Sequence, residues 1–300
     1  MSRGFWLGVS AYGIWGLFPI YWKLVADVPA DQVLAHRIVW SCVALVAILM
    51  WPSRPRLPLA TLTTRIVLLY LAAAILIGVN WYLYVWAVGH DLVVETSLGY
   101  YITPLVNVVL GVAVLGERLR RTTWVAVGLA ACGVAILTWA YGAPPRIALA
   151  LAASFGTYGL VKKTAPLPPL EGLALETVLL GLPAAAYLAA AERGGTGVFL
   201  HSAAAASVFL IGGGLVTIAP LLLFASAVRL VPLSTMGLLQ FISPTIQLVL
   251  AVAIYREPFG RSRVAGFVAV WLALVLFAID QIRQRGSGPL VTAEAAAEGV

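Results

Sequence analysis

The chain has 300 residues, of which 62% are hydrophobic and only 10% are charged, and its formal net charge is +7. A soluble domain carries about 25% charged residues, so this chain cannot cover a soluble surface and lipid must be its main solvent. The basic residues lie in short clusters between apolar runs, where topology determinants are found. This pattern argues against nucleic acid as a partner.

The apolar runs, taken in chain order, predict an all-α polytopic membrane protein with ten transmembrane helices. A spanning helix needs roughly 20 mostly apolar residues, and the runs separate at charges, prolines and polar clusters. Residues 284–300 are rich in Gly, Ser, Ala and Glu, so we expect a disordered cytoplasmic tail. The predicted helices cover residues 4–25, 32–51, 65–87, 92–115, 122–141, 146–162, 170–191, 205–228, 233–255 and 262–282.

The distribution of Lys and Arg predicts that both termini face the cytoplasm, because basic loops stay inside. With the N-terminus inside, twelve basic residues lie inside and six lie outside, while Arg37 falls within a helix. Three of the outside residues, Arg256, Arg261 and Arg263, run against the rule. The inside residues are Arg3, Arg54, Arg56, Arg65, Arg118, Arg120, Arg121, Lys162, Lys163, Arg229, Arg283 and Arg285, and the other outside residues are Lys23, Arg146 and Arg193.

An internal repeat accounts for those three exceptions. When the sequence is shifted by 140 residues, Pro104 falls on Pro244 and Glu117 falls on Glu257. Apolar matches are expected by chance between any two spans, whereas matched prolines and carboxylates are not. The basic cluster after Glu117 therefore corresponds to the one around Glu257, on the opposite side of the membrane.

Earlier segments repeat as well. AYGIWGL at residues 11–17 resembles SFGTYGL at residues 154–160. We therefore predict two repeats, 1–143 and 144–283, with five spanning helices each. Repeats with an odd number of spans must enter the membrane in opposite directions, which is the inverted plan of many secondary transporters.

Several segments carry a family resemblance over nearly all of residues 5–280. They include AHRIVWS, NWYLYVWAV, ETSLGYYITPLVNVVLG, SFGTYGLVKK, GLALETVLLGLP and LLQFISPT. These segments resemble the RarD branch of the EamA-type drug/metabolite transporters. The resemblance implies a permease and identifies no substrate. One departure is Gln32, where the family pattern would have Glu.

Prolines and closely spaced glycines mark where helices are expected to bend or to pack tightly. Pro104 and Pro244 remove a helix hydrogen bond in mid-span, and the freed carbonyl needs a partner or a cavity. Matched kinks predict hinges beside a site at the bilayer midplane, and simple structural kinks are the alternative. The glycines expected to let helix backbones approach are Gly13, Gly16, Gly156 and Gly159.

Ionisable residues within spanning helices are costly, so each one is a candidate for function. His36 and Arg37 lie in the second span, and Arg37 is expected to pair with Asp91 or Glu95 near the outer end. Structural ion pairs are one interpretation, and substrate binding or a proton relay with gating is the other. The residues expected to pair near the inner end are Glu176, Lys162 and Lys163.

Uncharged polar and aromatic side chains from several spans are expected to face a common solute site. A buried amide needs polar partners, and aromatic rings offer stacking surface; hydrogen bonds that only join helices are the alternative. The substrate-binding candidates are Tyr12, Trp15, Asn80, Tyr84, Tyr101, Asn107, Tyr158, Gln240, Phe241 and Gln247. Tryptophans near span ends, predicted to form interfacial belts, are Trp6, Trp22, Trp51, Trp81 and Trp139.

Together these features predict a transporter of a small organic solute, such as an amino acid, a metabolite or a drug, by alternating access across the bacterial plasma membrane. The sequence has no GxxxxGK[ST] nucleotide loop, which favours facilitative or secondary-active transport and leaves proton coupling open. The expected partners are the solute and the lipid bilayer, with a homodimer left open, and we expect no cofactor, metal or catalytic residue. The alternative is an intramembrane enzyme or a lipid-handling protein.

Overall fold

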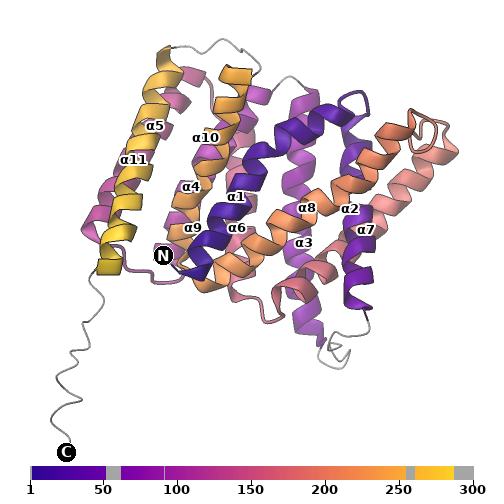
Figure 1. Cartoon of the computed structure of the whole chain (residues 1–300), viewed down its shortest axis with the longest axis horizontal. Coiled ribbons are helices and arrows are strands. Elements are labelled where there is room, and N and C mark those ends of the chain that lie inside the picture. Colours follow the sequence, from indigo (N-terminus) through magenta and orange to yellow (C-terminus); the bar gives the residue numbers. More distant parts are fainter. Residues whose placement is uncertain (1, 52–61, 91, 255–260, 287–300) are drawn as a thin grey trace, which may run out of the picture.

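The computed structural model describes residues 2–51, 62–90, 92–254 and 261–286, and within these ranges the fold is entirely helical (Figure 1). The predicted tail lies outside the described residues from position 287 onward. The main helices are α1 (Arg3–Trp22), α2 (Ala30–Leu49), α3 (Thr64–Gly89), α4 (Val93–Ala113), α5 (Arg121–Tyr141), α6 (Arg146–Thr164), α7 (Pro169–Arg193), α8 (Ala204–Leu230), α9 (Leu233–Gln240), α10 (Ile242–Val249) and α11 (Arg261–Gly286).

The predicted all-α polytopic membrane fold is confirmed. The first eight predicted spans correspond to α1 through α8, and the last corresponds to α11. In the described part of the chain, six helices are long and apolar enough to cross a membrane by length and composition alone, namely α2, α3, α4, α5, α7 and α8. Helix α6 is less apolar because Lys162 and Lys163 lie in its last turn.

The ninth predicted span is broken into α9, α10 and a π-helical segment, Leu250–Ile254. The break follows from Pro244, which has no amide hydrogen and leaves the carbonyl of Gln240 without its helical donor. Pro104, by contrast, lies inside α4 without ending it. The helix therefore ends near only one of the two matched prolines, and the predicted kink at Pro104 stays a prediction.

Packing explains why α4 continues through its proline. The Thr103 hydroxyl donates to the Gly99 carbonyl at 2.6 Å. Helix α9 also approaches closely at this point, because a Cβ on Gly237 would lie only 2.5 Å from the Pro104 carbonyl oxygen. Helix α9 therefore packs directly against α4 at the turn that contains Pro104.

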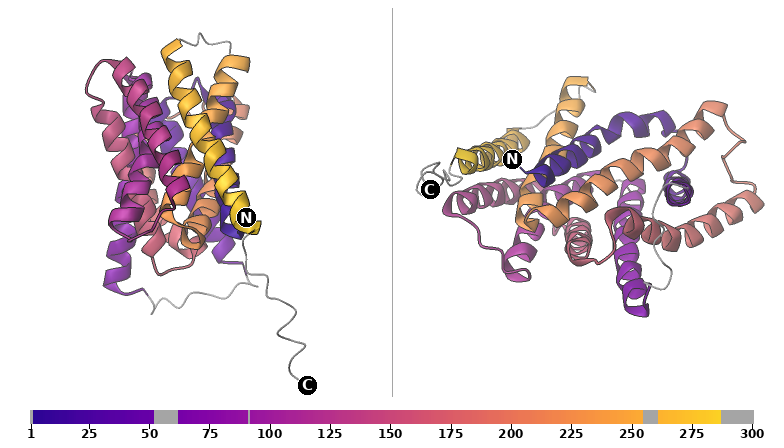
Figure 2. Two further views of the ribbon diagram at one scale, coloured as in Figure 1. Left: turned by 90° about the vertical axis from the view of Figure 1, so that its left-hand side faces the viewer. Right: turned by 60° about the horizontal axis from the view of Figure 1, so that its bottom comes forward.

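The two halves of the chain interleave. Helix α1 packs against α8 and α10, and α6 packs against α3 and α4, while α5 and α11 form a pair at one edge (Figure 1). These pairings are the ones expected if a two-fold axis exchanges α1 with α6, α3 with α8 and α4 with α9–α10. The inverted repeat itself stays a prediction, and Glu257 lies outside the described residues. The start of α1 and the end of α11 lie at the same end of the bundle (Figure 2).

Two of the four predicted close-packing glycines are tightly enclosed. A Cβ on Gly16 would lie 2.7 Å from the Ile246 Cβ, and one on Gly156 would lie 2.6 Å from Val106 Cγ1. These contacts join α1 to α10 and α6 to α4. Gly13 has nothing within 4 Å of such a Cβ, so its predicted contact is wrong, and Gly159 makes only ordinary contacts.

Candidate functional site

Five aromatic rings meet at the centre of the bundle. Tyr12 and Trp15 come from α1, Phe155 and Tyr158 from α6, and Phe224 from α8. The Phe224 ring lies 5.7 Å from Trp15 and 6.1 Å from Tyr158, centroid to centroid, and is stacked on the latter. The two sequence segments that resemble one another, 11–17 and 154–160, thus bring their aromatic residues to one cluster.

Three of these five rings were predicted from the sequence, and two were missed. Phe155 occupies the first aromatic position of SFGTYGL, so it corresponds to Tyr12 in AYGIWGL. Phe224 corresponds to Tyr84 in the 140-residue register. The internal repeat could therefore have identified Phe155 and Phe224, because each one corresponds to a predicted site residue in the first half of the chain.

Amides from both halves of the chain bond beside the aromatic cluster. The Asn107 amide on α4 donates to the Gln240 side-chain oxygen on α9 at 2.9 Å, and both residues are buried. The Asn107 Oδ1 atom and the Tyr12 hydroxyl are buried with no hydrogen-bond partner among the described residues. An unpartnered buried polar atom is costly, so both atoms are available to a solute or to water.

Asn80 lies in the same region and ties two helices together. Its amide donates to the Leu151 carbonyl and to the Ser154 hydroxyl of α6, each at 2.9 Å. Asn80 and Gln240 both line a cavity of about 30 Å³. Such a cavity accommodates water but no organic solute, for which pockets of about 300 Å³ or more are usual. A solute therefore needs these helices to move apart.

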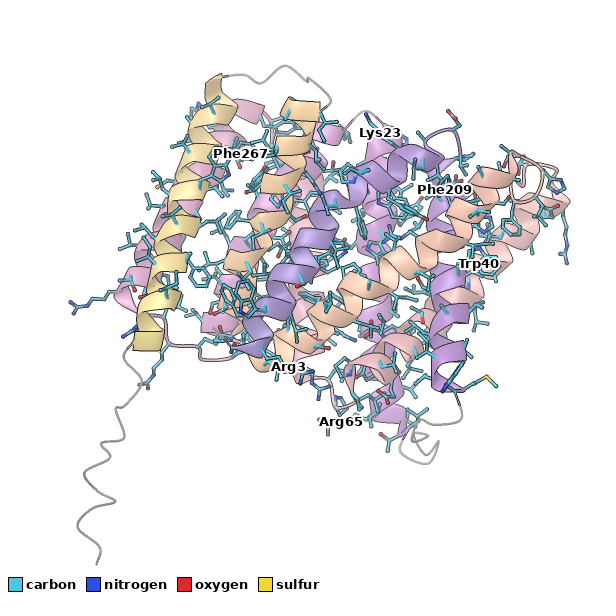
Figure 3. All side chains as sticks on the ribbon, in the orientation of Figure 1. Arg3, Lys23, Trp40, Arg65, Phe209 and Phe267 are labelled. Atoms are coloured by element: carbon cyan, nitrogen blue, oxygen red, sulfur yellow. The ribbon has the colours of Figure 1, made fainter. Side chains whose placement is uncertain are left out.

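The other substrate-binding candidates lie away from this centre or point elsewhere. Tyr101 packs edge-on against Phe267 of α11, which Figure 3 labels. Tyr84 lies 5.9 Å from Tyr100, ring to ring. Phe241 is fully buried at the break between α9 and α10. The remaining candidate, Gln247, donates to the Trp15 carbonyl oxygen at 3.3 Å and so joins α10 to α1.

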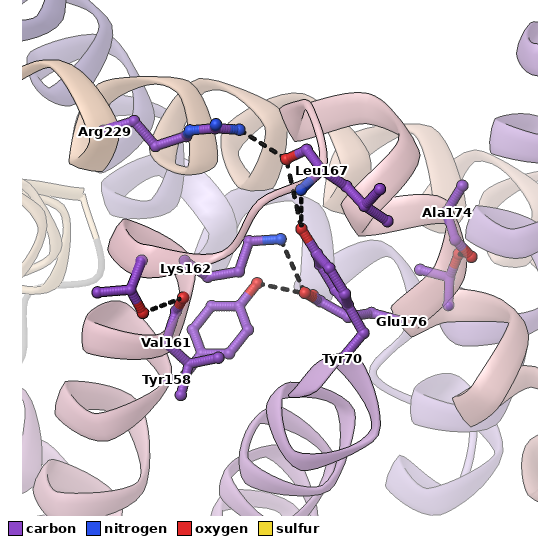
Figure 4. A network of polar contacts seen from close by, with 10 residues as sticks. Tyr70, Tyr158, Val161, Lys162, Leu167, Ala174, Glu176 and Arg229 are labelled. Atoms are coloured by element: carbon purple, nitrogen blue, oxygen red, sulfur yellow. Dashed lines mark hydrogen bonds and ion pairs between the residues drawn. The ribbon is translucent and has the colours of Figure 1, made fainter. Parts of the chain in front are cut away.

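A buried ion pair joins α6 to α7. Lys162 Nζ on α6 lies 2.7 Å from Glu176 Oε1 on α7, and both side chains are almost fully buried. The Tyr158 hydroxyl donates to the other oxygen of the same carboxylate at 3.1 Å. The expected pair of Glu176 with Lys162 is thus confirmed, and its second donor comes from the aromatic cluster (Figure 4).

The surroundings of this pair extend to two further helices, α3 and α8 (Figure 4). Tyr70 of α3 hydrogen-bonds the Leu167 backbone, whose carbonyl also accepts from Arg229 of α8 at 2.6 Å. Lys163, the alternative partner expected for Glu176, instead donates to the carbonyls of Val228 and Val231. The pairing of Glu176 with Lys163 is therefore wrong, because Lys163 supplies donors at the end of α8.

Glu95 does not pair with Arg37, so that expectation is wrong. The Glu95 carboxylate accepts from the Ile147 backbone amide at 2.7 Å and from the Tyr141 hydroxyl at 3.1 Å. It thereby caps the first turn of α6, where unpaired backbone amides favour a negative charge. The other expected partner, Asp91, lies outside the described residues.

Arg37 is held by aromatic rings instead. Its guanidinium carbon lies 4.3 Å from the Trp81 ring centroid and 5.2 Å from that of Trp22. These two tryptophans are also predicted to form part of an interfacial belt, and both are only half-exposed. Trp139 is 90% exposed and has the exposure that such a belt requires.

A larger cavity, of about 490 Å³, lies beside His36 at the end of the bundle opposite the termini. It is bounded by α2, α7 and the loop that leads to α8. His36 lies next to the Phe199 ring, 5.1 Å centroid to centroid. Gln32, the departure from the family pattern, holds the loop by donating to the Thr196 carbonyl and accepting from the Val198 amide.

Known proteins resemble this chain over most of its length. The model of the EamA-like transporter family matches residues 2–139 and again residues 146–279. Protein RarD of Streptomyces exfoliatus is 45% identical, and the match covers 93% of this chain and 89% of that protein. A Bacillus subtilis protein described as the uncharacterized transporter YojE is 44% identical over 90% of this chain and 91% of its own.

The fold has a counterpart among solved structures. One crystal structure superposes with a TM-score of 0.69 and 14% sequence identity, over 96% of this chain and 100% of that one. At this identity the likeness concerns the fold alone. The family match and the close relatives carry the assignment: the chain belongs to the EamA-like transporter family, in its RarD branch.

Proposed function

We propose that this protein is a facilitative or secondary-active transporter that moves a small organic solute across the plasma membrane by alternating access. Its family membership supports transport as the general activity. Amino acids, metabolites and drugs all remain within the proposed solute class. Both termini are proposed to lie in the cytoplasm, which agrees with the position of the start of α1 and the end of α11 at one end of the bundle.

The observation that carries this proposal is the meeting of the two halves at one polar and aromatic centre. Tyr12 and Trp15 face Tyr158 across the Phe224 ring, and Asn107 bonds Gln240 between α4 and α9. A solute held there would contact both halves at once. Rocking of one half against the other would then expose the solute to either side in turn.

The two halves are proposed to be inverted repeats, residues 1–143 and 144–283. Two consecutive matches to one family model, at 2–139 and 146–279, support this division. Helix α1 packs on α8 and α10, and α6 packs on α3 and α4. This correspondence supports a two-fold relation between the halves. Pro244, where α9 gives way to α10, is the proposed hinge of the second half.

The buried pair of Lys162 and Glu176 is a proposed gating or proton-relay element. It lies against Tyr158, and so connects directly to the proposed solute centre. Protonation of Glu176 would release Lys162 and weaken the contact between α6 and α7. A structural ion pair without a relay role is the alternative, and transport at a series of pH values separates the two.

Counterflow in proteoliposomes tests the proposed function. Vesicles with the purified protein are loaded with an unlabelled extract of the host's small metabolites and diluted into the same extract made with a heavy isotope. We expect labelled solute to accumulate in these vesicles and not in empty ones. Conversion of a metabolite without accumulation would favour the intramembrane enzyme instead.

A further inference from the structure

Arg37 presents an unusual arrangement for a membrane-embedded cation. It lies on α2, between Trp22 of α1 and Trp81 of α3, with its guanidinium close to both rings. Its Nε atom is buried and, among the described residues, has no hydrogen-bond partner. An arginine side chain carries five N–H donors, and burial of such a group without acceptors is costly.

No carboxylate of the described chain balances this charge. The described ion pairs are Arg120 with Asp280, Lys162 with Glu176, and His201 with Glu192. Of the two carboxylates expected to pair with Arg37, Glu95 is occupied at the start of α6, and Asp91 lies outside the described residues. Lys162 has a carboxylate 2.7 Å away, whereas no carboxylate of the described residues forms an ion pair with Arg37.

The walls around Arg37 are aromatic and lead toward the proposed solute centre. Tyr84 of α3 lies 5.9 Å from Tyr100 of α4, ring to ring. Tyr100 also lines the small cavity that Asn80 and Gln240 share. Trp81 itself packs against the buried core that contains Tyr12, Tyr158 and Phe224. One wall of the Arg37 site therefore adjoins the proposed solute centre.

We propose that Arg37 binds the carboxylate of the transported solute. The indole rings of Trp22 and Trp81 stabilise the cation through its charge, without accepting the conventional hydrogen bonds that its donors can make. A planar guanidinium matches a carboxylate in a two-pronged geometry. The rings around it would pack on the apolar part of the same molecule. The inference rests on the proposed transport function and names the chemical class of its solute.

Binding to the purified full chain tests this site directly. In dodecyl maltoside micelles, which contain no lipid phosphate, three aromatic acids are titrated by calorimetry: benzoate, phenylacetate and indole-3-acetate. Their uncharged amides are the matched probes. We expect at least one acid to bind more tightly than its amide. Equal binding of acids and amides, or no binding of any acid at millimolar concentration, would overturn the site.

Substitution of the arginine separates its charge from its packing. Arg37→Gln should weaken acid binding on the order of 10- to 100-fold, the usual loss for a charged hydrogen bond, and leave amide binding unchanged. Arg37→Lys keeps the charge without the fork and should retain a weaker preference for the acid. Arg146→Gln removes an exposed positive charge at the start of α6 and should bind like the unchanged protein. Retained preference in Arg37→Gln would contradict the inference.

Flux measured alongside binding distinguishes this inference from the transport proposal. Acid binding that depends on Arg37, without counterflow of any acid, would support the anion site and contradict transport. Counterflow of a solute that is unaffected by both Arg37 variants would support transport and overturn the anion site. If the acids bind only after anionic lipid is added, the site belongs to a lipid headgroup. That result would also overturn the solute proposal.

Discussion

At the scale of single residues, the buried Lys162 and the half-buried Arg37 are stabilised in different ways. Lys162 forms an ion pair with a carboxylate that also accepts a hydrogen bond from a tyrosine hydroxyl. Arg37 instead contacts two indole rings and no anion among the described residues. The prediction that Arg37 and Glu176 answer to different partners is confirmed. Removing one member of a buried pair costs about 3–5 kcal/mol, because the other charge is left without compensation.

A charge exchange tests the identity of these partners. Glu176→Lys and Lys162→Glu should each lower the thermal unfolding midpoint in detergent, and the double exchange should recover much of that loss. The combination Glu176→Arg with Arg37→Glu should recover none of it, because those side chains are not partners. Recovery by the second combination would mean that Arg37 and Glu176 pair directly in the membrane.

The sequence predicts which ionisable side chains are costly to bury in the membrane. It does not predict which groups become their partners. Burial of Arg37 and Glu95 follows from their positions in apolar runs. The use of Glu95 depends on the start of α6, 52 positions further along the chain, where a free backbone amide needs an acceptor. Such a cap is a tertiary contact, and the spacing of residues near Glu95 in the sequence does not predict it.

At the scale of helices, a single glycine can decide how closely two neighbouring helices pack. Gly16 lets α1 approach α10, because any Cβ would meet the Cβ of Ile246. Gly13, one turn earlier on the same helix, has open space around it. In the sequence Gly13 and Gly16 are equivalent candidates for a close helix contact. Only the packing shows that Gly16 is enclosed and Gly13 is open.

Alanine at these two positions makes a matched comparison. Gly16→Ala should destabilise the protein by about 1–3 kcal/mol, the usual cost of overpacking. Gly13→Ala should be neutral or stabilising by about 0.5–1 kcal/mol, because alanine is the better helix former. The unfolding midpoints of both variants, measured by circular dichroism in detergent, check the difference. A Gly16→Ala variant as stable as Gly13→Ala would contradict the described contact.

Element boundaries follow the sequence well where charge and proline agree, and less well where packing intervenes. Pro244 ends α9 as a proline rule predicts, yet Pro104 does not end α4, since the contact with Gly237 of α9 supports it.

At the scale of the whole molecule, the topology makes a direct prediction. The start of α1 and the end of α11 lie at one end of the bundle, and the excess of Lys and Arg predicted on that side leads us to expect that it faces the cytoplasm. A reporter enzyme fused after residue 300 and active only in the cytoplasm should therefore be active. Activity solely from a reporter that requires the outer side would contradict this orientation.

The central claim is that the solute passes through the centre where Asn107 and Gln240 bond. Metabolite counterflow in proteoliposomes containing Gln240→Ala tests it most directly, with Trp139→Ala, an exposed ring on α5, as the control at equal protein abundance. Loss of one hydrogen bond to the solute, about 1 kcal/mol, predicts roughly fivefold weaker transport for Gln240→Ala and unchanged transport for Trp139→Ala. Normal counterflow by Gln240→Ala would contradict a solute path through this centre.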